Sequence, residues 1–159
     1  MEMFEGKVCA FTGHREIERE KAIKTFEFIK LYLEKLIVEE GYTIFKAGGA
    51  IGFDAICAES VLRLKEKYPH IELHLYIPHL RQSATFTEKQ KRVYMKHINA
   101  ADKRFVISEK YTRGCMHTRN RALVDGSDLL IAYLTQNKGG TFYTVDYARK
   151  KGVETINVA

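Results

Sequence analysis

The chain has 159 residues, of which 45% are hydrophobic and 29% are charged, and its formal net charge is +6. This length is typical of one domain, so we expect residues 1–159 to fold as a single unit around one core. The apolar content excludes an intrinsically disordered chain, and no apolar stretch approaches the ~18 residues that a membrane-spanning helix requires.

Two further features indicate where the protein acts. Residues 1–6 contain two glutamates and no apolar core of a signal peptide, so we expect no export. The three cysteines are an odd number without CxxC spacing, which argues against a disulfide framework and against a zinc ribbon. We therefore expect a cytoplasmic protein with reduced thiols and no membrane partner.

Positive charge is concentrated in one part of the chain. Residues 81–121 hold 11 Lys and Arg against 3 Asp and Glu, whereas residues 1–80 hold 11 against 13. Such an excess favours an anionic ligand, either a nucleotide phosphate or a nucleic acid. The alternative is a solvated helix face, which we favour for the four cations between residues 89 and 96.

Hydrophobic periodicity and helix-breaking residues divide the chain into alternating strands and helices. In chain order the sequence predicts a strand at 7–12, a helix that ends at 40, a strand at 42–46, a helix from 53 that ends before 69, a strand at 71–77, a helix at 87–100, a strand at 103–107, a helix at 115–125, a strand at 129–133, a helix at 140–151 and a strand at 153–158. This alternation indicates parallel βαβ units. We expect an α/β, Rossmann-like, doubly wound three-layer sandwich with a mostly parallel sheet.

The composition of the strands predicts their order. The first, fourth and fifth strands are apolar throughout, which is typical of strands that are buried on both faces. The third strand alternates and the sixth is mixed, which is typical of edges. These properties fit the order 3-2-1-4-5-6, in which ligands bind beyond the carboxyl ends of the strands where the winding reverses, here between the first and fourth strands.

Two glycine-rich segments follow expected strands at this rim, at residues 48–52 and 139–141, and each opens a helix. Glycine lets backbone N–H groups approach a phosphate, and a helix N-terminus adds about half a positive charge. The expected phosphate-binding residues are Gly48, Gly49, Gly52, Gly139, Gly140 and Thr141. The hydroxyl of the threonine can instead cap its helix. The chain has no GxxxxGK[ST] motif, so P-loop chemistry is not supported.

Thr12 ends the first strand, and Gly13, His14 and Arg15 follow it at the same rim. A guanidinium at this position suits a bidentate phosphate contact, and a surface ion pair with Glu18 is the alternative for the arginine. We expect the whole segment to contact the ligand.

Three polar residues complete the candidate site. Asp54, at the start of the second helix, can hold a ribose hydroxyl or accept hydrogen bonds from backbone N–H groups, and both interpretations stay open. We expect Arg119 to reach the crevice, and Asn120 to face inwards and hydrogen-bond a nearby loop.

The sequence predicts no metal site and identifies no catalytic residues. His70 and His74 have the HxxxH spacing of ligands on a helix, but four residues of the expected strand span roughly 13 Å. The sequence also lacks a GxSxG motif and a recognisable catalytic triad.

Four motifs in this order resemble those of the SLOG superfamily, which joins the Smf/DprA and LOG families. The motifs are residues 12–15, residues 48–54 in the pattern GGxxG[IVF]D, residues 119–120 followed by 125–128, and residues 139–141. The resemblance spans essentially the whole chain and is greatest to the small stand-alone YpsA-like bacterial proteins. It implies a nucleotide-binding Rossmann-like domain for a ligand like ADP-ribose, NAD or a nucleoside monophosphate, with no required cofactor. Superfamily members often dimerise, which makes a homodimer a further expectation.

Departures from the family motifs bear on activity. LOG phosphoribohydrolases carry a glutamate three residues after the threonine of PGGxGT, where this chain has Thr144. A threonine cannot serve as that carboxylate, so we expect binding by a sensor or regulatory module rather than LOG-type hydrolysis. A nucleotide-processing enzyme with an altered catalytic residue remains an alternative. DprA-like binding of single-stranded DNA is another, although Ile51 replaces the arginine of that family's GGARGID.

Overall fold

The computed structural model describes residues 6–159, so the expectation about export concerns residues that lie almost entirely outside this range. The strands are β1 (Lys7–Gly13), β2 (Tyr42–Ala47), β3 (Glu72–His79), β4 (Lys103–Ser108), β5 (Leu129–Tyr133) and β6 (Glu154–Asn157). The helices are α1 (Arg19–Glu40), α2 (Phe53–Lys67), α3 (Glu88–Ala100), α4 (Cys115–Val124) and α5 (Gly140–Lys151), with a 3₁₀ turn at Gln82–Thr85. None of these helices is long and apolar enough to cross a membrane.

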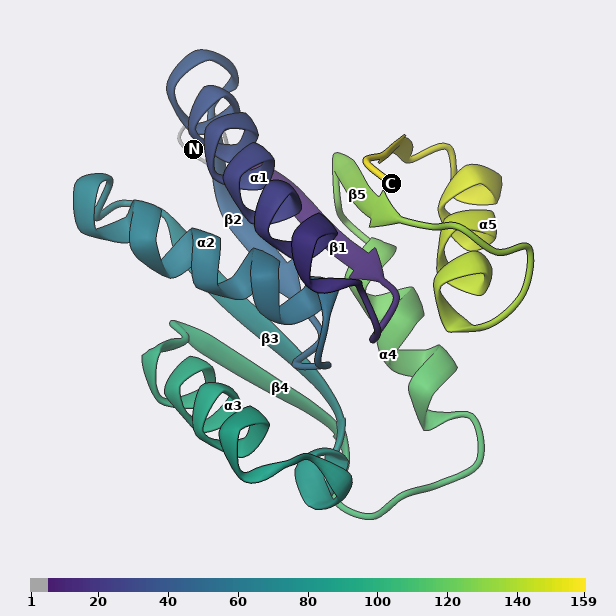
Figure 1. Ribbon diagram of the computed structural model, residues 1–159. Helices are drawn as coiled ribbons and strands as arrows, with labels where there is room; N and C mark the ends of the chain where they lie inside the picture. Colours follow the sequence, from purple (N-terminus) through teal and green to yellow (C-terminus); the bar gives the residue numbers. More distant parts are fainter. Residues whose placement is uncertain (1–5) are drawn as a thin grey trace.

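Six parallel strands form one sheet with helices on both faces, which confirms the predicted α/β class (Figure 1). Alternate residues of β1 divide the core between the two faces. Cys9 and Phe11 pack with residues of α1 and α2, whereas Ala10 packs with residues of α4 and α5. The remaining helix, α3, packs beside α2 on the first face.

The predicted strand order was wrong in one respect, because the observed order is β4-β3-β2-β1-β5-β6. β4 pairs with β3 at the edge of the sheet instead of lying beside β1. Its side chains Phe105 and Val106 are 40% and 44% exposed, so an apolar composition does not mean burial here. β3, expected at an edge, lies inside the sheet.

The physical reason lies in the crossovers. Right-handed connections through α1, α2 and α3 keep these helices on one face and add each new strand on the same side of β1. The chain then returns to the other side of β1 through α4, which covers the opposite face. The winding therefore reverses between β1 and β5, and not between β1 and β4.

Candidate functional site

The candidate site is a cleft at the carboxyl ends of β1 and β5, where the winding reverses. Its volume is about 420 Å³. Its walls come from the loops after β1 and β5, from Ala50 in the loop after β2, and from the N-terminal parts of α2, α4 and α5. The predicted residues that it brings together are Thr12, Gly13, His14, Arg15, Asp54, Arg119, Asn120, Gly139, Gly140 and Thr141.

Gly48, Gly49 and Gly52 do not line this cleft, although they belong to the loop beside it. Gly52 has φ +78°, and a Cβ there would lie 2.4 Å from the carbonyl oxygen of Arg15. A Cβ on Gly48 would lie 2.5 Å from the guanidinium of Arg119. The glycines therefore let this loop pack tightly against its neighbours. Gly49 and Gly52 face a separate cavity of about 180 Å³ between the loop and α3.

Asp54 braces the same loop from the start of α2. Its Oδ2 accepts hydrogen bonds from the backbone N–H groups of Gly48 at 3.0 Å and Ala50 at 3.3 Å. Its Oδ1 is buried and has no hydrogen-bond partner within residues 6–159. Burial raises the pKa of Asp54, against the opposing effects of the Arg119 charge, the two backbone hydrogen bonds and the Arg15 charge. Asp54 thus accepts hydrogen bonds from backbone N–H groups, and its contact with a ribose hydroxyl remains a prediction.

Arg119 is 5% exposed and connects three parts of the structure. Its Nη1 donates hydrogen bonds to the carbonyl oxygens of Gly48 and Tyr76 and to Oε1 of Gln82. Its Nε donates to Oδ1 of Asn120 at 2.8 Å, so the asparagine faces inwards but bonds its neighbour rather than a loop. Burial lowers the pKa of Arg119, and the nearby Asp54 carboxylate opposes that shift. Nη2 makes no hydrogen bond in the described part of the chain.

Two exposed cations lie on the walls of the cleft. Arg15 lies in the loop after β1, and the ion pair with Glu18, the alternative to a ligand contact, is not formed. Lys138 lies just before α5 and was missed, although its position directly before Gly139 was a usable signal. Both ammonium and guanidinium groups can therefore reach a ligand in the cleft without first breaking an ion pair within residues 6–159.

The first turn of α5 forms one wall. Gly139 and Gly140 begin the helix, and Thr141 is 7% exposed. Thr144 is fully buried, and its hydroxyl donates a hydrogen bond to the carbonyl oxygen of Gly140 at 2.8 Å. Thr144, at the position of the LOG glutamate, therefore hydrogen-bonds the backbone of its own helix and does not line the cleft.

Two histidines line the cleft. Nε2 of His14 accepts a hydrogen bond from the backbone N–H of Thr135 at 2.8 Å, which ties the loop after β1 to the loop after β5. His117 stacks on Tyr143 with ring centroids 3.9 Å apart and planes at 9°. Nothing in the sequence pattern identified this stack, because it joins two separate helices.

A doubly wound parallel sheet with loops gathered over one cleft defines a Rossmann-like α/β protein. A family model described as the YspA SLOG family matches residues 9–157. The chain therefore belongs to this YpsA-type family of the SLOG superfamily, as its motifs indicated.

Two bacterial proteins illustrate the similarity to curated relatives. The chain is 29% identical over 130 residues to an uncharacterized SPbeta prophage-derived protein, YoqJ, of Bacillus subtilis, covering 74% of this chain and 76% of the relative. It is 30% identical over 154 residues to a UPF0398 protein of Halalkalibacterium halodurans, covering 91% and 82%.

Two solved structures of DNA processing protein A share the fold. The protein from Streptococcus pneumoniae superposes with a TM-score of 0.69 at 17% identity, over 97% of this chain and 50% of that chain. The protein from Helicobacter pylori, solved in a study of single-stranded DNA binding, gives 0.66 at 20% identity, over 97% and 66%. This chain thus spans half to two-thirds of the length of these structural neighbours.

Proposed function

We propose that the cleft binds the phosphate groups of a nucleotide or nucleotide derivative, and that the protein acts as a sensor or regulatory module. The observation that carries this proposal is the N-terminus of α5 in the wall of the cleft, facing the same space as Arg15 and Lys138. The first N–H groups of a helix have no partner within the helix, and a phosphate satisfies them while it meets the positive end of the helix dipole.

Binding without LOG-type hydrolysis agrees with the carboxylates of the site. Asp54 is the one carboxylate residue in the cleft wall among the described residues, and its Oδ2 is already bound to the backbone of the adjacent loop. Thr144 is buried behind the wall. A hydrolase of the LOG type carries its glutamate at the position of Thr144, and this chain has no carboxylate there.

Single-stranded DNA is the second candidate ligand, supported by the fold shared with the Helicobacter pylori protein. The exposed loop between β4 and α4 carries Lys110, Tyr111 and Arg113, and it leads into the wall of the cleft at Met116. Cations interleaved with an aromatic side chain are typical of surfaces that bind single strands. The two candidates differ in whether a mononucleotide is sufficient for binding.

The test is a thermal unfolding series with AMP, ADP-ribose, NAD and a short oligothymidylate. A ligand at about 100 Kd adds roughly 2.7 kcal/mol to the free energy of unfolding. We expect stabilisation by at least one small nucleotide, and its loss in Arg15→Ala and Lys138→Ala. Arg92→Ala, which removes an exposed cation of α3 outside the cleft, is the matched control.

Stabilisation by the oligonucleotide alone would favour the second candidate. Equal responses of Arg15→Ala and the wild type to a small nucleotide would contradict the cleft assignment. Release of free base from AMP at enzymatic rates would contradict binding without hydrolysis.

A further inference from the structure

The cleft carries one feature that phosphate binding does not use, the parallel stack of His117 on Tyr143. His117 belongs to the first turn of α4 and Tyr143 to the first turn of α5, so the stack lies beside the helix end proposed to hold phosphate. His117 lines the cleft and is exposed to solvent. Because Tyr143 covers one face of the imidazole, the exposed surface belongs to the other face and the ring edges.

The stack is held in place from behind. Arg121 donates a hydrogen bond from Nη1 to the hydroxyl of Tyr143 at 2.7 Å, and another from Nη2 to Oγ1 of Thr118 at 3.2 Å. The tyrosine is therefore fixed to α4 at its hydroxyl end, and its ring fixes the orientation of His117. A surface aromatic ring that is oriented in this way loses little conformational freedom when a second ring packs on it.

We infer that His117, supported by Tyr143, is a stacking platform for the nucleobase of the ligand. This inference rests on the proposed function, because it divides the same cleft into a phosphate end at α5 and a base end at α4. Stacking on an aromatic ring tolerates any base, since every base has a π face. The ligand class that follows is a nucleotide with an intact base, in preference to a sugar phosphate or an inorganic phosphate.

Polar side chains in the wall of the same cleft fit a nucleotide ligand. Gln136 lies in the wall of the same cleft and carries an amide that can both donate and accept hydrogen bonds at the edge of a base. Lys138 lies two residues further along, beside the helix end. The wall of the cleft thus carries a cation, an amide and an aromatic ring, the groups that a nucleotide requires.

The experiment compares AMP with ribose 5-phosphate, which lacks the base, by calorimetric titration. In the wild type we expect AMP to bind about tenfold or more tightly than ribose 5-phosphate, as expected for one stacked base. His117→Ala should weaken AMP to the level of ribose 5-phosphate and leave ribose 5-phosphate unchanged. His117→Phe should restore most of the preference, because it retains a ring.

The fluorescence of etheno-AMP distinguishes direct stacking on His117 from a purely structural role of this residue. Its emission should be quenched on binding to the wild type and to Tyr143→Phe, and should recover in His117→Ala. His70→Ala is the matched control, because His70 is also exposed and also contacts a tyrosine, Tyr68, outside the cleft.

The outcomes separate the two proposals. If none of AMP, ADP-ribose, NAD and ribose 5-phosphate binds, the proposed function fails; if only ADP-ribose or NAD binds, that nucleotide replaces AMP in the comparison. If both bind equally in the wild type, or His117→Ala leaves AMP affinity and etheno-AMP quenching unchanged while Arg15→Ala abolishes binding, the phosphate site stands and the stacking platform is overturned. Circular dichroism shows whether each variant is folded, and His117→Phe decides the question if the alanine variant is not.

Discussion

The guanidinium of Arg119, on α4, donates a hydrogen bond to the carbonyl oxygen of Gly48, in the loop after β2. The same guanidinium also reaches Tyr76 on β3 and Gln82 in the 3₁₀ turn. One buried cation from the second face of the sheet therefore holds the glycine loop in the shape that forms one side of the cleft.

Arg119→Ala should lower the free energy of unfolding by about 2–4 kcal/mol, because it leaves the Gly48 carbonyl without its donor and removes the larger of the two positive charges that act on Asp54. Arg119→Lys should restore the charge but only part of the stability, since an ammonium cannot reproduce the forked contacts. Urea unfolding of both variants measures this, with Arg92→Ala as the control. A loss below about 1 kcal/mol for the alanine variant would show that Arg119 does not brace the loop.

Gly52 in the glycine loop and Gly41 at the end of α1 allow a test of how strictly this loop requires glycine. Their φ values are +78° and +76°, but Gly41 is left-handed helical with ψ 24° whereas Gly52 has ψ −129°. A Cβ on Gly52 would also meet the Arg15 carbonyl, whereas a Cβ on Gly41 would meet nothing within 4 Å. Gly41→Ala should cost about 1 kcal/mol, the ordinary cost of an alanine in this conformation. Gly52→Ala should cost at least about 2 kcal/mol more and weaken nucleotide binding, because the loop that carries Arg15 must move. Equal losses in chemical denaturation would contradict this account of the loop packing.

Thr144 gives a prediction about catalysis. Its hydroxyl is fully buried against the Gly140 carbonyl, so Thr144→Val should cost about 1 kcal/mol and leave nucleotide affinity unchanged. Thr144→Glu places a carboxylate in the same buried position, and we expect destabilisation by at least about 2 kcal/mol and no hydrolysis of AMP. Chromatographic detection of free adenine checks the second part. Base release by a folded Thr144→Glu variant would mean that this position can reach the sugar.

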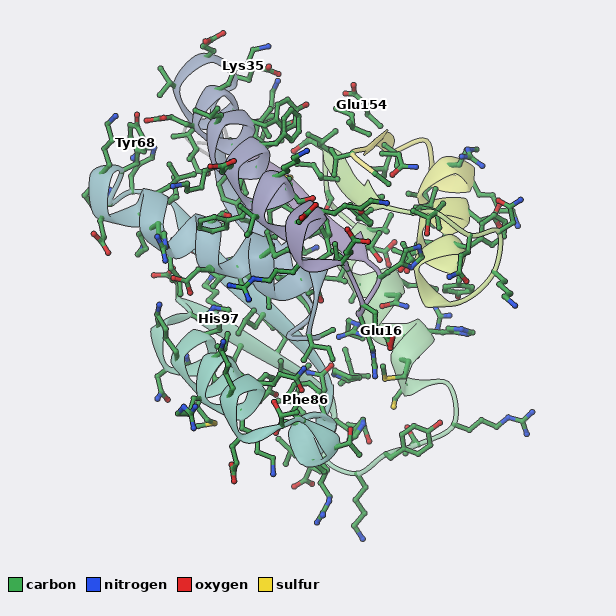
Figure 2. All side chains as sticks on the ribbon, in the orientation of Figure 1. Glu16, Lys35, Tyr68, Phe86, His97 and Glu154 are labelled. Atoms are coloured by element: carbon green, nitrogen blue, oxygen red, sulfur yellow. The ribbon has the colours of Figure 1, made fainter. Side chains whose placement is uncertain are left out.

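Glu59 connects α2 to α3 and makes stability depend on pH. Burial alone would raise its pKa, but hydrogen bonds from Lys96, His97 and Arg63 lower the pKa to about 2. Figure 2 shows His97 on the side of α3 that faces α2, in agreement with its 3.0 Å contact to Glu59. A carboxyl group whose pKa is lower in the folded state stabilises the fold above its unfolded value and loses this contribution as the pH falls towards the folded value.

The difference in unfolding free energy between the wild type and Glu59→Gln should therefore be about 1–2 kcal/mol at pH 6, because partial exposure of the group screens the full effect. It should shrink as the pH falls from 4.5 towards 2. Urea titrations at several pH values between these limits measure it. A difference that stays constant across this range would rule out the ion-pair cluster as its source.

The sequence was sufficient to predict the helices and strands, the parallel sheet and the convergence of the loops after β1 and β5. Hydrophobic periodicity and the positions of glycines are local signals for these features. The place of β4 was not predictable from composition, since Phe105 and Val106 are apolar at an exposed edge. The bracing role of Arg119 and the stack of His117 on Tyr143 depend on contacts between elements far apart in the chain. Such contacts follow from the strand order, which the sequence pattern indicated only in part.

The most direct test of the phosphate cleft is an amide chemical-shift titration of the uniformly ¹⁵N-labelled protein with AMP. We expect the largest saturable changes at the backbone amides of Gly13, Gly140 and Thr141, and smaller ones at the amides around α3. Changes confined to the cavity between the glycine loop and α3, or no saturable changes at Gly140 and Thr141, would contradict the claim that the loops after β1 and β5 form a phosphate site.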